Sequence, residues 1–317
     1  MTDKLHIAYA TDDGYAQHVA VSLYSLFRSA EHPELLSVFI LANSLSDSHK
    51  RNLSAIAEKF GKALIFIDIS NIAALLPEGI DTANLSISTY CRLFVAELLP
   101  DDVTTLLYLD CDTYINDDIS DIWRHIPQNG AWDVAGVEDT MYPDLKAGIG
   151  LEPEDLYLNA GILLINLRRW RETGITAKFI DFINRYDGAV PHLDQGVLNG
   201  VFRVTKVTIP LRYNVQAPIF AIHTRKNLMA FFSLKHYYDQ DEIRQARDNP
   251  AIVHFTSFFL ERPWFEFCLH PLRHLYRDTL SLTPYSDVSL QRNPMSMMAK
   301  FKDWCFRYFQ PVYLKIR

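Results

Sequence analysis

Two acidic side chains follow directly on an apolar stretch of the chain. Asp110 and Asp112 come after residues 105–109, which read as a buried strand. Side chains at i and i+2 of a regular strand share a face, so both carboxylates should point the same way, with Cys111 opposite. At the carboxyl end of a strand they would enter the crevice where open α/β sheets bind ligands, and two anionic oxygens there suit a divalent cation. A bare DxD tripeptide also occurs by chance as a solvated turn, so the argument depends on the preceding strand.

His254 ends another strand-like segment, residues 252–255. A single histidine beside apolar residues is usually a core side chain with a satisfied hydrogen bond. With a DxD elsewhere in the chain, its imidazole becomes a sensible third ligand. A nitrogen ligand favours Mn²⁺ over Mg²⁺, which remains the alternative cation.

Two further polar groups could face a sugar. Asn159 can accept and donate hydrogen bonds toward hydroxyls, and Ala160 and Gly161 would let a ligand approach the backbone. Asp194 could hold hydroxyls, while Gln195 could face the anomeric carbon. The competing interpretations are a buried strand after a tight turn and a helix capped by Asp194.

The elements that must position these residues alternate between strand and helix. Apolar strand patterns at 5–10, 38–41 and 63–68 are separated by helical patterns at 15–27 and 47–60. This alternation predicts an α/β fold with a mainly parallel sheet covered by helices on both faces. The further elements expected are a helix at 88–98, strands at 105–109, 133–137, 161–166 and 252–255, and a short helix at 194–199.

Composition limits the class of protein. The 317 residues are 49% hydrophobic and 22% charged, as in a globular protein, and the net charge of −7 speaks against nucleic-acid binding. The four cysteines form no CxxC pair, which predicts reduced thiols in a cytoplasmic protein. We also expect no signal peptide and no membrane-spanning segment.

The last residues differ in character from the rest. Residues 295–317 contain five basic residues and one acidic residue, a net +4, so the remainder carries −11. A basic aromatic amphipathic helix is typical of an anchor at a membrane surface. The alternative is that its apolar stripe packs back on the catalytic domain. The stripe consists of Met298, Phe301, Trp304, Cys305, Tyr308 and Phe309. We therefore divide the chain into a catalytic domain, 1–284, and a tail, 285–317.

Six segments, taken together and in order, resemble the retaining glycosyltransferases of family 8, which include bacterial lipopolysaccharide α-galactosyl- and α-glucosyltransferases and glycogenin. The resemblance extends from residue 5 to about residue 285. Its motifs lie at residues 8–15, 86–93, 107–112, 158–166, 194–199, and 254–256 with 262–264.

The resemblance implies a GT-A fold, which is Rossmann-like, and a UDP-hexose donor. It also assigns roles to residues by motif. Asp12 would bond the uracil base and Tyr15 would stack on it, with Ala10 beside them and Arg92 near the donor. The remaining roles are Mn²⁺ ligation by Asp110, Asp112 and His254, a further donor contact by Asp112, enclosure of the donor sugar by Asn159, Ala160, Asp194 and Gln195, and diphosphate binding by Arg262.

The sequence departs from the family pattern around the diphosphate site. Arg262 stands where the family usually has lysine, and residues 256–261 replace a turn that usually contains glycine. Arginine is a competent and more bidentate phosphate ligand. An acidic residue is expected near the sugar, and both Glu138 and Asp139 could supply it.

The resulting prediction is an enzyme that transfers galactose or glucose, with alpha linkage, from a UDP-sugar to a surface-glycan acceptor such as lipopolysaccharide or lipooligosaccharide. It would work at the cytoplasmic face of the inner membrane, with its tail on the membrane. The alternatives are a metal-dependent nucleotidyltransferase or phosphohydrolase, or a scaffold that has lost catalysis. The acidic, glycine-poor turn at 11–14 speaks against a nucleotidyltransferase.

Overall fold

The computed structural model describes residues 4–316 apart from 78, 82–86, 128–129 and 294, so Ser86 of the second motif lies outside the described residues. The strands are β1 Leu5–Thr11, β2 Leu36–Ala42, β3 Leu64–Asp68, β4 Leu106–Leu109, β5 Thr113–Ile115, β6 Val134–Glu138, β7 Leu158–Ile165, β8 Lys206–Thr208, β9 Val215–Gln216 and β10 Ile252–His254.

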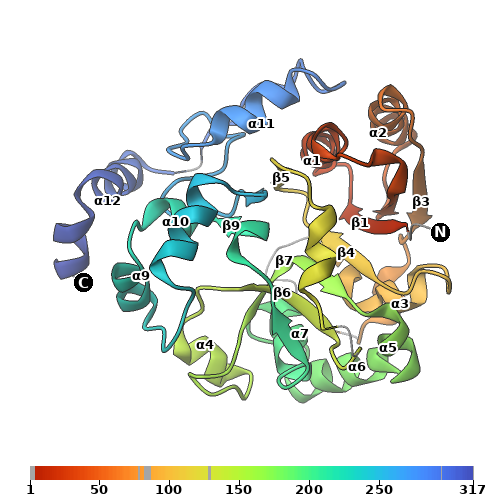
Figure 1. Ribbon diagram of the computed structural model, residues 1–317, viewed down its shortest axis with the longest axis horizontal. Helices are drawn as coiled ribbons and strands as arrows, with labels where there is room; N and C mark the ends of the chain where they lie inside the picture. The colour runs from red at the N-terminus through yellow and green to blue at the C-terminus, as the bar shows by residue number, and fades with distance from the viewer. Residues whose placement is uncertain (1–3, 78, 82–86, 128–129, 294, 317) are drawn as a thin grey trace.

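The helices lie between and around these strands (Figure 1). The α-helices are α1 Ala16–Ser29, α2 Asp47–Lys59, α3 Val95–Leu98, α4 Pro143–Gly148, α5 Leu167–Glu172, α6 Ile175–Arg185, α7 Leu193–Val201, α8 Ala217–Ala221, α9 Arg225–Phe232, α10 Gln240–Asp248, α11 Arg273–Leu280 and α12 Met297–Ile316. The longest 3₁₀ segment among the described residues is η3, Ile87–Phe94.

Within the described residues, the main sheet has seven strands in the order β3-β2-β1-β4-β7-β6-β8, and β5, β10 and β9 form a smaller sheet. The first four strands are parallel, β7 is antiparallel to both of its neighbours, and β8 is parallel to β6. The predicted mainly parallel α/β sheet is therefore confirmed.

Alternate side chains along each strand enter different cores, as the period of two requires. Ile7 and Tyr9 of β1 pack with α1 and α2, whereas Ala8 and Ala10 pack on the opposite face with η3 and α7. Such double burial explains why these strands read as nearly continuous apolar runs.

Most predicted elements are close to the observed ones, with two corrections. The helix expected at 88–98 is mainly the 3₁₀ helix η3, and only its last turn is α3. The strand expected at 161–166 begins three residues earlier, because β7 starts at Leu158, so Asn159, Ala160 and Gly161 are strand residues.

The tail helix α12 lies at one edge of the molecule, near α9 and α10 and far from the N-terminal end (Figure 1). It contacts the body through one side, on which Phe306 is completely buried and Asp303 and Gln310 are nearly so. Whether 285–317 forms a separable unit stays a prediction. Among the described residues, no helix is both long and apolar enough to cross a bilayer. The side chains of Lys315 and Arg317 lie outside the described part.

Candidate active site

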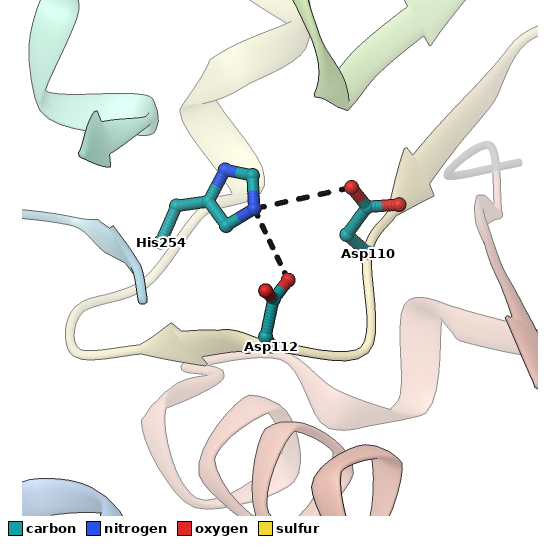
Figure 2. Close-up of side chains that lie close together, drawn as sticks. All are labelled: Asp110, Asp112 and His254. Carbon is teal, nitrogen blue, oxygen red and sulfur yellow. Dashed lines mark hydrogen bonds and ion pairs between the residues drawn. The ribbon is translucent and has the colours of Figure 1, made fainter. Parts of the chain in front are cut away.

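Asp110, Asp112 and His254 converge where β4, β5 and β10 meet. Figure 2 shows the imidazole pointing at both carboxylates. One ligand atom of each residue lies within 4.8 Å of the others. Nε2 of His254 is 3.1 Å from Oδ1 of Asp112 and 3.9 Å from Oδ2 of Asp110. Two carboxylates and one imidazole form a donor set that fits Mn²⁺.

The strand geometry predicted for the two aspartates is wrong. β4 ends at Leu109 and β5 begins at Thr113, so both carboxylates lie in the connecting turn. The Thr113 hydroxyl donates to the backbone oxygen of Asp110 at 2.8 Å and stabilises this turn. The carboxylates converge because the chain reverses there, while the thiol of Cys111 is buried and donates to the backbone oxygen of Ala10.

Asn214 fixes the orientation of the His254 ring. Its side-chain nitrogen donates to Oδ1 of Asn159 at 2.8 Å, so its oxygen is left to accept from Nδ1 of His254 at 3.1 Å. Nδ1–H therefore donates to Asn214, and Nε2 faces the two aspartates. Burial opposes a charged ring, but Asp112 and then Asp110 raise the pKa of His254, and in its neutral form Nε2 would be free to bind a metal ion. This contact was not predicted, because Asn214 stands in no motif and is 40 residues from His254.

Gly161 makes room for the metal-type cluster, by which we mean Asp110, Asp112 and His254. A Cβ atom at this position would lie 2.3 Å from Cε1 of His254 and 2.8 Å from Oδ2 of Asp110. Such contacts are too close for any side chain, so alanine would displace both groups. Gly161 also lines the cavity in front of these groups, so close approach of a ligand to its backbone stays a prediction.

Arg92 is buried and links two carboxylates. Its guanidinium lies 2.8 Å from Oδ1 of Asp110 and 2.9 Å from Oδ2 of Asp194, and it also donates to the backbone oxygen of Ala160. Burial nevertheless raises the pKa of Asp194 to about 6, since Arg92 only partly offsets it and Asp110 repels the charge. With its donors engaged, Arg92 acts chiefly by positioning these acids.

A cavity of about 760 Å³ opens in front of the cluster, a size typical of small-ligand sites. His254 is not among its lining residues and lies behind the two aspartates, only 4% exposed. All the other predicted site residues line the cavity: Ala10, Asp12, Tyr15, Arg92, Asp110, Asp112, Asn159, Ala160, Asp194, Gln195 and Arg262.

A hydrogen-bonded group of amides forms one side of the cavity. Gln195 accepts from the backbone N–H of Ala160 at 2.9 Å and donates to Oδ2 of Asp139 at 3.0 Å. Asn159 donates to the same carboxylate oxygen at 3.1 Å. Of the two acids expected near the sugar, Asp139 lines the cavity, whereas Glu138 is not among its lining residues and pairs with His236 at 2.9 Å.

The backbone at the N-terminus of α7 has an unusual conformation. His192 and Leu193 both have positive φ, 62° and 52°, immediately before Asp194 and Gln195. Positive φ is uncommon outside glycine and is found at functional sites when the surroundings hold it. His192 also lines the cavity and lies 3.4 Å from the Gln195 amide nitrogen, a contact that no sequence motif indicated.

Arg262 brings an incompletely satisfied cation to the cavity. Its Nε is buried without a hydrogen-bond partner among the described residues and lies 3.9 Å from Oδ2 of Asp112. Burial would raise the pKa of Asp112, but His254 and then Arg262 reverse this and bring it to about 2. Asp112 is therefore a carboxylate at neutral pH, and the Arg262 side chain, 34% exposed and lining the cavity, offers its positive charge to a phosphate group.

Comparison with known proteins places this site in a family. The model of glycosyl transferase family 8 matches residues 6–268. The chain belongs to this family. It is therefore a hexosyltransferase with the GT-A fold, which disfavours the phosphohydrolase, nucleotidyltransferase and scaffold alternatives.

Individual relatives are distant in sequence but align with most of the chain. This family 8 chain is 27% identical over 293 residues to the lipopolysaccharide 1,2-glucosyltransferase of Escherichia coli (strain K12), covering 91% of this chain and 81% of that one. It is 26% identical over 289 residues to general stress protein A of Bacillus subtilis (strain 168), covering 90% and 96%. The crystal structure of the galactosyltransferase LgtC with donor and acceptor sugar analogues superposes with a TM-score of 0.70 at 25% identity, covering 88% and 96%.

Proposed function

We propose that this family 8 enzyme transfers galactose or glucose from a UDP-hexose to a hydroxyl of a surface glycan, with retention of the alpha configuration. The observation that carries the proposal is that one cavity is lined by groups suited to three parts of a nucleotide-sugar. A metal-type cluster and Arg262 suit a diphosphate, the wall of Gln195 and Asp139 suits sugar hydroxyls, and Tyr15 at the rim suits a base. The lipopolysaccharide relative and LgtC act on glucose and galactose respectively, so both sugars stay open.

The residues divide the donor between them. Tyr15 is 39% exposed at the cavity rim, where its ring can stack on uracil, and Asp12 accepts from the Tyr15 backbone N–H at 3.2 Å, which fixes the turn into α1. Asp110, Asp112 and His254 would hold Mn²⁺, with Mg²⁺ as the alternative. When bound, the ion supplies Lewis-acid stabilisation of the leaving diphosphate. Arg262 contributes a fixed positive charge to the same leaving group.

Retention follows most simply from attack on the leaving-group face. The alternative double displacement needs a free nucleophile, usually a carboxylate. Gln195 is a poor nucleophile, and both ends of its amide are hydrogen-bonded. Asp194 is 4% exposed and paired with Arg92. We therefore propose that the departing phosphate oxygen takes the acceptor's proton. A glycosyl adduct trapped on either residue would contradict this mechanism.

We also propose that α12 attaches the enzyme to the cytoplasmic face of the inner membrane, where a lipid-linked acceptor would be presented. The expected alternative, in which the aromatic stripe packs on the body, is wrong. Phe301, Trp304 and Tyr308 are 59%, 43% and 62% exposed, and the helix docks through Phe306 instead. An exposed aromatic face with flanking basic residues is typical of interfacial helices.

A panel of UDP-hexoses tests the donor assignment. We expect Mn²⁺-dependent UDP release with UDP-galactose or UDP-glucose, slow with water and faster with a surface-glycan acceptor. Asp110→Asn should remove this release while leaving the fold intact, because it removes one of two anionic ligands. Release that is equally fast without a divalent ion would contradict the metal-assisted account. Absence of release with every UDP-hexose would contradict the proposed donor.

A further inference from the structure

A second cavity, of about 520 Å³, lies away from the donor site, where the end of α10 approaches α8 and the tail helix α12. One part of its wall is apolar and another is basic. Its lining residues are Phe220, His223, Arg247, Asp248, Pro271, Leu272 and Arg307. None of them takes part in the donor site described above.

Two guanidinium groups from different helices converge on His223. Nη1 of Arg307 donates to the backbone oxygen of Phe220 at 2.8 Å and lies 3.5 Å from Nε2 of His223. Nη1 of Arg247 donates to the backbone oxygen of His223 at 3.3 Å. The Nη2 atom of either arginine has no partner among the described residues.

The cavity carries more positive than negative charge. The acidic residue among those that line it is Asp248. Oδ1 of Asp248 pairs with Nε of Arg247 at 3.2 Å, and the Asp248 side chain is 56% exposed. No acid of the lining faces Arg307. Partial burial lowers the pKa of His223, and the positive charges of Arg307 and Arg247 lower it further. Burial also lowers the pKa of Arg307. Both shifts are those expected where positive charges lie together without a matching number of acids. Spare donors on two converging planar guanidiniums match a tetrahedral phosphate.

The position of the cavity indicates the source of that phosphate. Arg307 stands on α12 between Trp304 and Tyr308, whose rings are 5.3 Å apart and exposed. Aromatic side chains of this kind lie at the level of lipid headgroups. The apolar wall, including Leu272 and Pro271, could accept the first carbons beyond a headgroup phosphate.

We propose that this second cavity binds the phosphate group of an anionic membrane lipid when the exposed aromatic face of α12 lies in the membrane interface. The inference rests on the proposed membrane attachment of α12 and adds a defined headgroup site to it. It differs from general attraction between a basic helix and an anionic surface, because it assigns the recognition to Arg247, which lies on α10 outside the tail.

The matched pair Arg247→Gln and Arg244→Gln tests the assignment in the full-length protein. Both changes remove one positive charge from α10, but Arg244 lies outside the cavity and its side chain is 58% exposed. Vesicle sedimentation would compare phosphatidylcholine alone, phosphatidylcholine with phosphatidic acid, and phosphatidylcholine with oleate at equal surface charge. Thermal unfolding of each variant checks that folding is unchanged.

The wild-type protein should bind phosphatidic acid vesicles about tenfold or more tightly than oleate vesicles. Arg247→Gln should abolish that preference, whereas Arg244→Gln should keep it and lose about fivefold in overall affinity at most. Equal losses in the two variants would overturn the site in favour of general electrostatics. Inorganic phosphate that binds in an Arg247-dependent manner without any phosphate-lipid preference would overturn the lipid assignment. Absence of binding to all vesicles would overturn the membrane attachment itself.

Discussion

The donor cavity and the tail helix α12 differ in which side chains they bury and which they expose. In the cavity, charged and amide groups are buried, and Arg92, Asn159 and Gln195 are each held by several partners. Among the described side chains of α12, the aromatic ring of Phe306 is buried, while Phe301, Trp304 and Tyr308 remain exposed. The difference indicates two kinds of ligand: a small polar donor that needs fixed geometry, and a fluid surface that needs only an apolar face and charge.

Removing the central cation should have the largest effect on stability. Arg92→Met would leave the buried Asp194 and the half-buried Asp110 without their shared partner. We expect a loss of about 3–5 kcal/mol in the free energy of unfolding, measured in urea. Removing one partner of a buried ion pair leaves the remaining charge with neither its counterion nor full hydration. Arg124→Met, at a side chain 80% exposed, is the control and should change little. Similar losses in both variants would contradict the assigned role of Arg92.

On the tail, the comparison becomes one between two phenylalanines of the same helix. Phe306 stacks on Phe259 with ring centroids 4.0 Å apart, whereas Phe301 is 59% exposed. Phe306→Ala should destabilise the docking of α12 by about 3 kcal/mol through lost packing. Limited proteolysis would detect this as faster cleavage near residue 297. Phe301→Ala should leave the cleavage rate unchanged but weaken vesicle binding. The reverse pattern would show that α12 docks through the other face.

A smaller effect is expected from the residue behind the cluster. Asn214→Ala removes the acceptor for Nδ1 of His254, so the ring loses its orientation. Losses of such partners weaken metal affinity by about 10–100-fold. Titration with Mn²⁺ measures the change, with the exposed Asn184→Ala as control. Unchanged affinity would mean that Asn214 does not orient the histidine.

A last prediction concerns pH. Burial lowers the pKa of Lys206 to about 7, and its ammonium donates to the backbone oxygen of Asn199 on α7. Between about pH 7 and the unfolded pKa of about 10.4, the unfolded chain binds the extra proton, so stability should rise with pH. Urea unfolding at several pH values in this window should show the rise in wild type and a flatter curve in Lys206→Met. Parallel curves would contradict the lowered pKa.

The sequence predicted the sheet well because doubly buried strands leave long apolar runs separated by helical periodicity. It also predicted the convergence of Asp110, Asp112 and His254, since motif order and strand ends carry that information. It did not predict the turn that holds the two aspartates, because a DxD at a strand end reads the same in either geometry.

Other features depend on contacts between segments far apart in the chain. Asn214 reaches His254 only after β9 pairs with β10. Asp139 rather than Glu138 faces the cavity because β6 ends at Glu138 and the chain then turns. The face by which α12 docks is set by the pocket that receives Phe306, and a helical pattern rich in aromatics does not reveal which side that is.

Binding of Mn²⁺ with and without UDP tests the central claim, that Asp110, Asp112 and His254 form a diphosphate-linked metal site. Electron paramagnetic resonance of free Mn²⁺ would follow the titration in wild type and in Asp112→Asn. We predict that UDP tightens Mn²⁺ binding in the wild-type protein, because the diphosphate adds oxygen ligands, and that the variant loses this coupling. Mn²⁺ binding that is indifferent both to UDP and to Asp112 would contradict the account.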